Sequence, residues 1–407
     1  MDPMEIAAGL AEFDDRAPGS DAERRAALWL RRRLHAIGRE AVLEPAWVRP
    51  QWPWAHAIHA ALGVAGAVVA TSQLVAGAVI LALVTASATL DLLGVAHLGR
   101  RLTPERCTQN LVSAPTEATR SGARRIVRLM IVAQYDAPRG GLALRDRPRR
   151  FAATLQRLAR GYLPGPLSVV AIGPGLLLAA SVARLAGVDD LWPELVGVAF
   201  TVALVVALAL LVELALSPRG PGAGEPASGA GVAIALAAAL DRSPPRHLAV
   251  ELVLAGAGDG PSLGMRSFVR RRRASYAPEA TAVLHLAACG RGRPRWWTVD
   301  GPLVPLRLHP RLVAHCAQAA RDRRGLGAAP RRGHGAGAAW RARLARWPAI
   351  TVGCLEPDGL VPDVGRAADS AGRLDAGAMG AALSFCLEVV KRLDAELAGS
   401  RPPPRSG

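Results

Sequence analysis

The sequence has 407 residues, of which 51% are hydrophobic, and its mean hydropathy of +0.20 is high for a soluble protein. This composition excludes a disordered chain, and the length allows two or three folding units. The net charge is +17, and 49 of the 50 basic residues are arginine because Lys391 is the one lysine. The arginines follow no zinc-finger or RNA-recognition pattern and aromatic residues make up only 4% of the chain, so nucleic acid is not an expected partner.

The cysteines and the first fifty residues bear on the cellular compartment. The five cysteines are widely spaced and form no C-x-x-C pair, which indicates reduced core residues. The first fifty residues carry many charges of both signs, which excludes a cleaved secretory signal peptide. We therefore expect a protein that is not exported.

The first clear helix is predicted to begin after Ser20. Ser20 followed by Glu23 is the signature of a capping box, in which each residue satisfies a free backbone N–H group of the other. Gly38 is predicted to end the helix. Between these limits, apolar residues recur at helical spacing at Ala26, Leu30, Leu34 and Ile37.

Two long apolar blocks follow, at 55–98 and 163–217. The first contains one acidic residue, Asp91, and no lysine or arginine, and its likeliest turn is at 71–73. The second is broken by a polar stretch at 184–194, which leaves helices at 163–183 and 195–217. Because about 20 apolar residues cross a bilayer, each block predicts a transmembrane helical hairpin. The alternative is a pair of buried hairpins in the core of a soluble protein.

The charges around the blocks predict a topology. Arginines lie at the outer ends of both blocks, whereas the two tight connections hold almost none, so the positive-inside rule predicts four helices in the cell membrane with both termini and the soluble domain in the cytoplasm. Asp91 and Glu213 lie near the cytoplasmic ends of their helices, where we expect them to reach water. The flanking arginines are Arg39, Arg49, Arg100, Arg101, Arg106, those within 145–160, and Arg219.

The rest of the sequence alternates between strands and helices. Apolar, β-branched runs predict strands at 126–133, 248–255, 282–288 and 349–354, and helical patterns cover 228–240 and 375–397. This alternation predicts an α/β fold with a mostly parallel sheet. The expected domains are one discontinuous soluble domain (1–54, 99–162 and 218–400), hairpins at 55–98 and 163–217, and a disordered tail at 401–407.

Short motifs in the soluble segments resemble, in chain order, those of the di-zinc aminopeptidase family (metallopeptidase family twenty-eight, clan MH). The motifs are Asn110-Leu-Val-Ser113, Val132-Ala-Gln-Tyr-Asp136, Gly222-Ala-Gly-Glu-Pro-Ala-Ser-Gly229, Leu254-Ala-Gly-Ala-Gly-Asp-Gly-Pro-Ser-Leu-Gly264 and Trp347-Pro-Ala-Ile-Thr351. The resemblance covers nearly all of the soluble portion. It implies an aminopeptidase-like sheet with helices on both faces, interrupted here by the two hairpins.

The family's zinc centre is altered at almost every matching position. The positions are occupied by Gln134, Asp136, Glu225, Gly258, Asp259, Ala287 and Gly365. The resemblance implies that Gln134 and Gly365 replace the two histidine ligands, with Asp363 two residues from the second. It likewise implies that Gly258 replaces the glutamate base and Ala287 a ligand aspartate. Glu225 and Asp259 keep a carboxylate of altered length, and Asp136 is unchanged.

A second set of residues offers a residual metal site. His285 lies two residues before Ala287, on the same face of a predicted strand, and with Asp136, Glu225 and Asp259 it supplies four potential ligands. The alternative is a hydrogen-bonded histidine among the residual acids of an old cleft. His334 lies in a Gly- and Arg-rich segment and is expected to be exposed.

Three functions follow from these observations. The first is a membrane pseudopeptidase that binds a peptide or a membrane protein without cleaving it and needs no cofactor, since the family contains non-catalytic members. The second is a metal-dependent aminopeptidase with a rearranged zinc site. The third is a structural membrane protein. In each case the lipid bilayer is a partner, and each hairpin must bring its two ends together for the sheet to close, with the Asp136 and Glu225 edge toward the bilayer.

Overall fold

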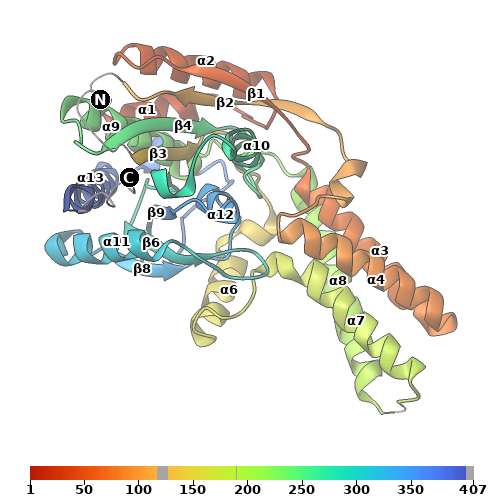
Figure 1. Ribbon diagram of the computed structural model, residues 1–407. Coiled ribbons are helices and arrows are strands. Elements are labelled where there is room, and N and C mark those ends of the chain that lie inside the picture. The colour runs from red at the N-terminus through yellow and green to blue at the C-terminus, as the bar shows by residue number, and fades with distance from the viewer. Residues whose placement is uncertain (117–126, 189, 400–407) are drawn as a thin grey trace.

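The computed structural model describes residues 1–116, 127–188 and 190–399, and the predicted disordered tail at 401–407 lies outside these ranges. Its centre is a nine-stranded sheet in the order β1-β2-β4-β3-β5-β9-β6-β7, with β8 beside β6 (Figure 1). The strands are β1 Val42–Val48, β2 Arg106–Ser113, β3 Val127–Gln134, β4 Leu248–Ala255, β5 Thr281–Leu286, β6 Arg293–Asp300, β7 Leu306–Arg307, β8 Ala329–Arg332 and β9 Ala349–Leu355.

The sheet is parallel at its centre and mixed at its edges. Strands β4, β3, β5 and β9 pair in parallel, and every residue of β4, β5 and β9 is buried. Their continuous apolar runs are typical of strands that are covered on both faces. The outer pairs β1–β2, β2–β4, β9–β6 and β6–β7 are antiparallel. The predicted α/β class is confirmed, although the sheet is mixed and not mostly parallel, because the edge strands reverse direction.

Helices cover both faces of this sheet. Helices α9 and α13 contact each other and the sheet, as do α10 and α12 in front of it in Figure 1. The predicted N-cap of α2 forms, because Ser20 Oγ accepts from the Glu23 N–H at 3.0 Å, but the Glu23 carboxylate accepts from the Gly19 N–H at 2.6 Å and not from that of Ser20, so the capping box is incomplete. The helices of the soluble part are α1 Pro3–Ala11, α2 Asp21–His35, α6 Asp146–Leu158, α9 Ser228–Arg242, α10 Leu263–Arg272, α11 Pro310–Asp322, α12 Ala338–Leu344 and α13 Ala376–Gly399.

The two apolar blocks form helical hairpins whose ends return to the sheet domain. Helices α3 (Trp52–Ser72) and α4 (Leu74–Leu92) stand between β1 and β2, which pair directly from Val48 opposite Arg106. Helices α7 (Val169–Leu185) and α8 (Trp192–Leu216) stand between β3 and α9. There an antiparallel bridge joins Arg139 to Arg219, and the Gly140 N–H donates to Pro218 at 2.9 Å. Each insertion therefore closes on itself, as predicted.

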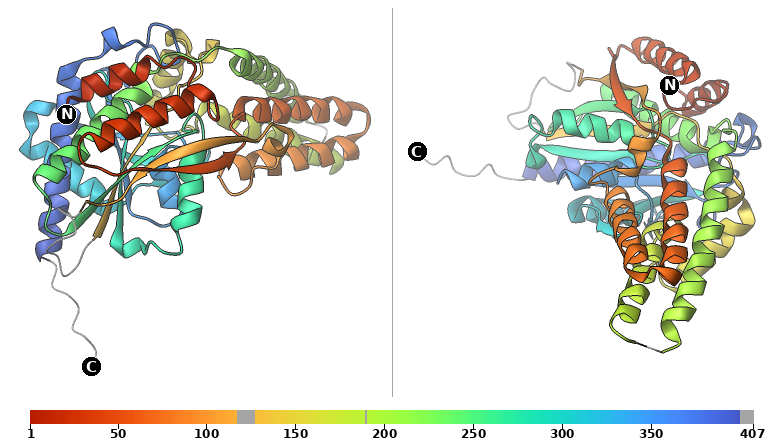
Figure 2. Two further views of the ribbon diagram at one scale, coloured as in Figure 1. Left: turned by 90° about the horizontal axis from the view of Figure 1, so that it is seen from above. Right: turned by 90° about the vertical axis from the view of Figure 1, so that its right-hand side faces the viewer.

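Helices α3, α4, α7 and α8 pack into one bundle that projects from the sheet domain (Figure 2). Small residues allow close approach, since a Cβ at Gly77 would lie 2.5 Å from the backbone of Ala70 in the neighbouring helix. The apolar contacts inside the bundle include Ala60, Leu81, Leu177 and Leu204. The bundle is thus held by its own core and not by the sheet.

The outer surface of the bundle is apolar. In the described part of the chain, five helices are long and apolar enough to cross a membrane: these four and α9. In α9, 83% of the apolar window is buried inside the protein, whereas in α8 the share is 11%. Large apolar side chains on α4 and α8 are therefore exposed, among them Val75 (64%), Leu83 (68%), Leu195 (69%) and Val198 (66%). Apolar surface of this extent marks a region that something apolar must cover.

Several residues that the sequence assigned to the membrane surface instead have buried partners. Asp91 was expected to reach water, but its side chain is fully buried and pairs with Arg100 at 2.9 Å and with His97 at 2.5 Å. Arg39 is buried against Asp241 at 2.6 Å. Arg219 is also buried, against Asp259 at 3.1 Å. These arginines bind internal carboxylates, so they do not count as headgroup anchors.

Candidate functional site

The cleft that the sequence predicted lies where the central parallel strands end. It has a volume of about 310 Å³ and is lined by residues that follow β3, β4 and β5, together with the turn before α9 and Trp52 at the start of α3. Crevices at the carboxyl ends of parallel strands are the usual binding sites of open α/β sheets. The predicted residues that line it are Gln134, Asp136, Glu225, Gly258, Asp259, His285 and Ala287.

The Gln134 side chain fills the space that a side chain at position 258 would need. The Gln134 side chain donates from Nε2 to Ser262 Oγ at 2.8 Å. A Cβ atom at position 258 would lie 2.5 Å from Gln134 Cγ and 2.6 Å from Oε1. The Gln134 side chain and a side chain at position 258 therefore exclude each other, because the amide group fills the volume that a residue at 258 needs.

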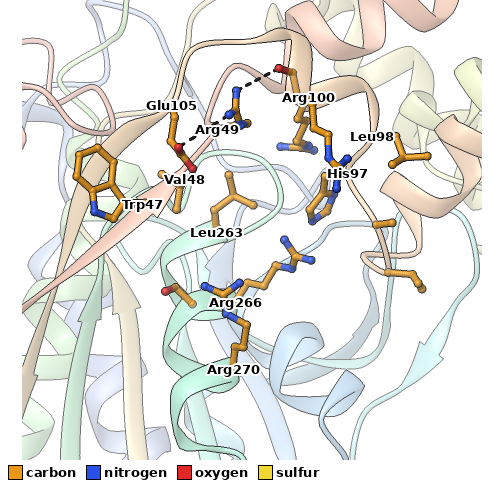
Figure 3. A pocket seen from close by; sticks show the side chains of 14 residues that line it. Trp47, Val48, Arg49, His97, Leu98, Arg100, Glu105, Leu263, Arg266 and Arg270 are labelled. Atoms are coloured by element: carbon orange, nitrogen blue, oxygen red, sulfur yellow. Dashed lines mark hydrogen bonds and ion pairs between the residues drawn. The ribbon is translucent and has the colours of Figure 1, made fainter.

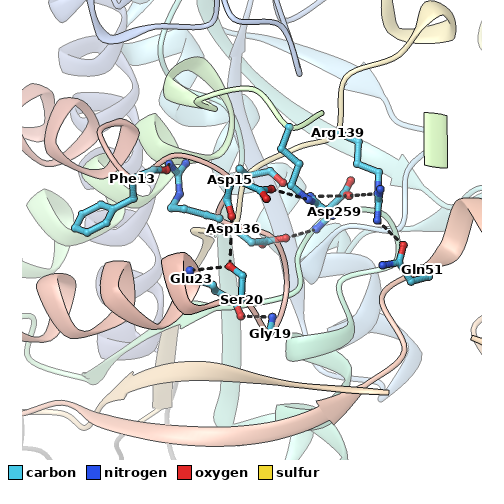
Figure 4. Close-up of polar contacts among 12 residues, drawn as sticks. Phe13, Asp15, Gly19, Ser20, Glu23, Gln51, Asp136, Arg139 and Asp259 are labelled. Carbon is cyan, nitrogen blue, oxygen red and sulfur yellow. Dashed lines mark hydrogen bonds and ion pairs between the residues drawn. The ribbon is translucent and has the colours of Figure 1, made fainter. Parts of the chain in front are cut away.

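Two carboxylates that would face a metal are already bound by protein groups (Figure 4). Asp136 accepts the N–H of Gly258 at 2.6 Å and that of Asp259 at 3.0 Å, and burial raises its pKa to about 6. Asp259 lies 3.1 Å from Arg219 Nη1 and 3.6 Å from Arg139 Nε. Both guanidinium groups are nearly buried, so they neutralise Asp259 in place of a metal ion.

Glu225 is partly buried, and of the charged groups around it Arg149 has the largest effect on its pKa. Burial raises the pKa of Glu225, and the positive charge of Arg149 opposes that rise. Asp369 lies next to the same turn and accepts the Gly224 N–H at 2.6 Å, and burial raises its pKa to about 7. This side of the cleft is acidic, and Arg149 of α6 partly balances its negative charge.

His285 of β5 also lines the cleft and is neutral at pH 7. Its Nδ1 lies 3.2 Å from Thr351 Oγ1, and burial lowers its pKa to about 4. Asp300, also buried in the lining of the cleft, accepts the N–H groups of Gly301 at 3.1 Å and Gly335 at 2.7 Å, and burial raises its pKa to about 7. His285 is therefore in hydrogen-bond contact with Thr351 and lies in the same cleft as Asp136, Glu225 and Asp259.

The remaining predicted positions lie elsewhere. Gly365 does not line the cleft, although Val364 does. Its φ is +70°, and a Cβ there would collide with the carbonyl oxygen of Arg139. A histidine at this position would require a different backbone. His334, predicted to be exposed, is partly buried in a second cavity of about 170 Å³ beside Trp52.

These residues do not fit the two zinc ions that the resemblance implies. A zinc site needs three or four imidazole, thiolate or carboxylate donors at about 2 Å. Asp136 already accepts two backbone hydrogen bonds, Asp259 is paired with two arginines, and Gln134, Gly258 and Ala287 offer no suitable donor. Within residues 1–116, 127–188 and 190–399, no group of three or more His, Cys, Asp or Glu side chains is placed to hold a metal ion.

The two arginines of this site were not among the residues predicted to form it. Arg139 and Arg219 flank the second hairpin, where a basic residue is normally read as a membrane anchor. Arg139 Nη2 also donates to Gln51 Oε1 at 2.6 Å, just before α3 (Figure 4). The one available signal was the position of both residues beside the motifs that carry Asp136 and Glu225.

The segment between α1 and α2 contacts the chain segments that carry the cleft residues. Arg16 is fully buried and donates to the carbonyl oxygens of Tyr135 at 2.9 Å and Pro221 at 2.8 Å, which ties together the segments on both sides of the second hairpin. Glu23 accepts from Thr108 Oγ1 at 2.6 Å. Burial, together with the charge of Asp136, raises the pKa of Glu23 to about 8.

A scan against protein-family models finds no match for this chain, and a search of curated proteins finds none either. Solved structures do match. A Zn-dependent exopeptidase from Parabacteroides distasonis aligns with a TM-score of 0.54 at 13% identity, over 96% of both chains. A glutaminyl cyclase from Porphyromonas gingivalis aligns with a TM-score of 0.54 at 12% identity, over 96% of this chain and 97% of that one.

A leucine aminopeptidase precursor from Bacteroides thetaiotaomicron aligns with a TM-score of 0.51 at 14% identity, over 96% of this chain and 95% of that one. Identities this low establish the fold and say nothing of the chemistry. The resemblance that the motifs carried is confirmed at that level. The chain has the aminopeptidase-like fold shared by these exopeptidases and glutaminyl cyclases.

Proposed function

We propose that this chain is a multi-pass membrane protein whose aminopeptidase-like domain binds a peptide or a membrane protein without cleaving it. The observation that carries the proposal is the double ion pair of Asp259 with Arg219 and Arg139, at 3.1 and 3.6 Å. Hydrolysis of an amide by this fold would need a metal-bound water and a base, and Gly258 supplies no base. The cleft has a volume of about 310 Å³ and acidic lining residues, which are features of a binding site.

The bundle supports the membrane part of the proposal. Its exposed helices are long enough to span a bilayer, and lipid is the occupant that suits an apolar outer surface on α4 and α8. Trp52 belongs both to the first residues of α3 and to the lining of the cleft. A ligand would therefore enter the cleft close to the membrane surface, which favours a membrane-bound or membrane-delivered partner.

The test of the non-catalytic role is an activity assay on the full chain in detergent with added zinc. We expect no turnover of aminoacyl anilides or of peptides with an N-terminal glutamine above the rate in buffer, because loss of a general base alone lowers rates by about a hundredfold or more. The Parabacteroides distasonis exopeptidase serves as the positive control. Zinc-dependent turnover that disappears in the Asp136→Asn variant would favour an aminopeptidase with a rearranged site.

The topology is tested by cysteine labelling. The background is Cys107→Ser, since Cys107 is half-buried and the four other cysteines are buried. Because arginines at 49, 101 and 106 still flank the first hairpin, we expect the domain on the cytoplasmic side. A membrane-impermeant maleimide should then label cysteines introduced at Ser72 and Asp190 in intact cells, and one at Glu279 only after lysis. Labelling in the opposite order would place the domain outside the cell.

A further inference from the structure

A cavity at the base of the first hairpin has five arginines among its 14 lining residues. It has a volume of about 490 Å³ and lies between the end of β1, the segment that follows α4, and α10 (Figure 3). Arg266 and Arg270 reach into it from α10. Its five arginines are Arg49, Arg100, Arg101, Arg266 and Arg270, and its one acidic lining residue is Glu105.

Most of this positive charge has no internal counter-charge. Arg49 lies 3.8 Å from Glu105, and Arg100 lies 2.9 Å from the buried Asp91. Arg101, Arg266 and Arg270 form no ion pair with any residue in the described ranges of the chain. Burial, together with the positive charges of Arg270 and Arg100, lowers the pKa of Arg266. Like charges gathered in one cavity repel each other, so an anion from outside the chain would stabilise this arrangement.

The same charge continues into a neighbouring cavity of about 560 Å³. The two cavities share Val95, Arg266 and Arg270, and the second adds the arginines Arg273, Arg341 and Arg346. Arg341 is 3% exposed, yet its Nη2 atom has no hydrogen-bond partner, and its Nε donates to the Pro261 carbonyl at 2.7 Å. The Nη1 atom of Arg100 also lacks a partner, although the residue is 2% exposed. Buried donors without acceptors are costly, and an oxygen-rich anion would satisfy them.

Apolar surface adjoins the arginines on the side of the bundle. Val95 lines both cavities and is 65% exposed, and Leu98 in the first cavity is 45% exposed. Both residues follow directly on α4, whose outer face exposes Val79 and Leu83. A ligand seated here would present its anionic end to the guanidinium groups and its apolar end to α4.

We propose that these joined cavities bind the phosphate of an anionic phospholipid, with the acyl chains along the outer face of α4. Arginine suits phosphate because its planar fork of donors matches two phosphate oxygens. Basic pockets beside transmembrane helices on the cytoplasmic side bind such headgroups. The assignment of a lipid, as opposed to a free phosphate, rests on the membrane anchoring proposed above.

The experiment uses the full chain in a nonionic detergent and follows thermal unfolding. The probes are short-chain phosphatidylglycerol, short-chain phosphatidylcholine and inorganic phosphate, each titrated separately, because a ligand that binds only the folded state raises the unfolding temperature once its concentration exceeds its dissociation constant. We expect phosphatidylglycerol to stabilise the chain at much lower concentration than the other two. In the Arg266→Gln/Arg270→Gln variant, its dissociation constant should rise about tenfold or more, since two charge-assisted contacts are lost.

The matched control is Arg31→Gln/Arg32→Gln on α2, which removes the same charge from an exposed helix far from the bundle (Figure 1). We expect wild-type affinity from it. An equal loss in both double variants, or none in the cavity variant, would overturn the site, and equal stabilisation by inorganic phosphate would overturn the lipid assignment. If the double variant unfolds, the single variant Arg270→Gln is tested in its place. Arg270 is exposed, so its replacement should leave the fold intact. A chain that stays soluble without detergent would overturn the membrane proposal separately.

Discussion

Replacing Gly258 with alanine is expected to lower the free energy of unfolding by about 1–3 kcal/mol, the usual effect of overfilling a packed region. The added methyl group would lie 2.5 Å from Gln134 Cγ, so the Gln134 side chain must move. That movement breaks its hydrogen bond to Ser262. Chemical denaturation of the purified protein measures the change.

A double-mutant cycle isolates this contact. In the Gln134→Ala background the space is empty, and Gly258→Ala should then have little effect, which gives a coupling energy of about 1 kcal/mol or more. The matched control is Gly372→Ala, because a Cβ at position 372 meets nothing within 4 Å. If Gly258→Ala costs the same in both backgrounds, Gln134 does not fill the position of the lost base.

The elements with a simple burial pattern were predictable from sequence. Strand β4 spans the predicted 248–255, since a strand covered on both faces leaves a continuous apolar run. The turn of the first hairpin falls at Gln73, within the predicted 71–73. Strand β6 was not predicted, because it begins Arg293-Pro294 and lies toward the edge of the sheet, where burial is partial and alternation weak.

The candidate site was only half predictable. Its location followed from the order of the motifs, and seven of the named positions share one cleft. Its electrostatics did not follow, because each decisive contact joins residues far apart in the chain. Arg219 and Asp259 are 40 positions apart, and Asp136 and Gly258 are 122 apart. A sequence shows that an arginine flanks an apolar block. It does not show whether the folded chain places a carboxylate next to that arginine.

We propose that protein contacts take the place of a zinc centre in this cleft, and zinc stoichiometry tests this proposal most directly. The purified chain, equilibrated with zinc and then passed through a desalting column, is analysed for metal by mass spectrometry. We expect substoichiometric zinc, unchanged in Asp136→Ala and Asp259→Ala variants, because Asp136 accepts two N–H groups and Asp259 is bound by two arginines. Two zinc ions per chain, lost in either variant, would contradict the account.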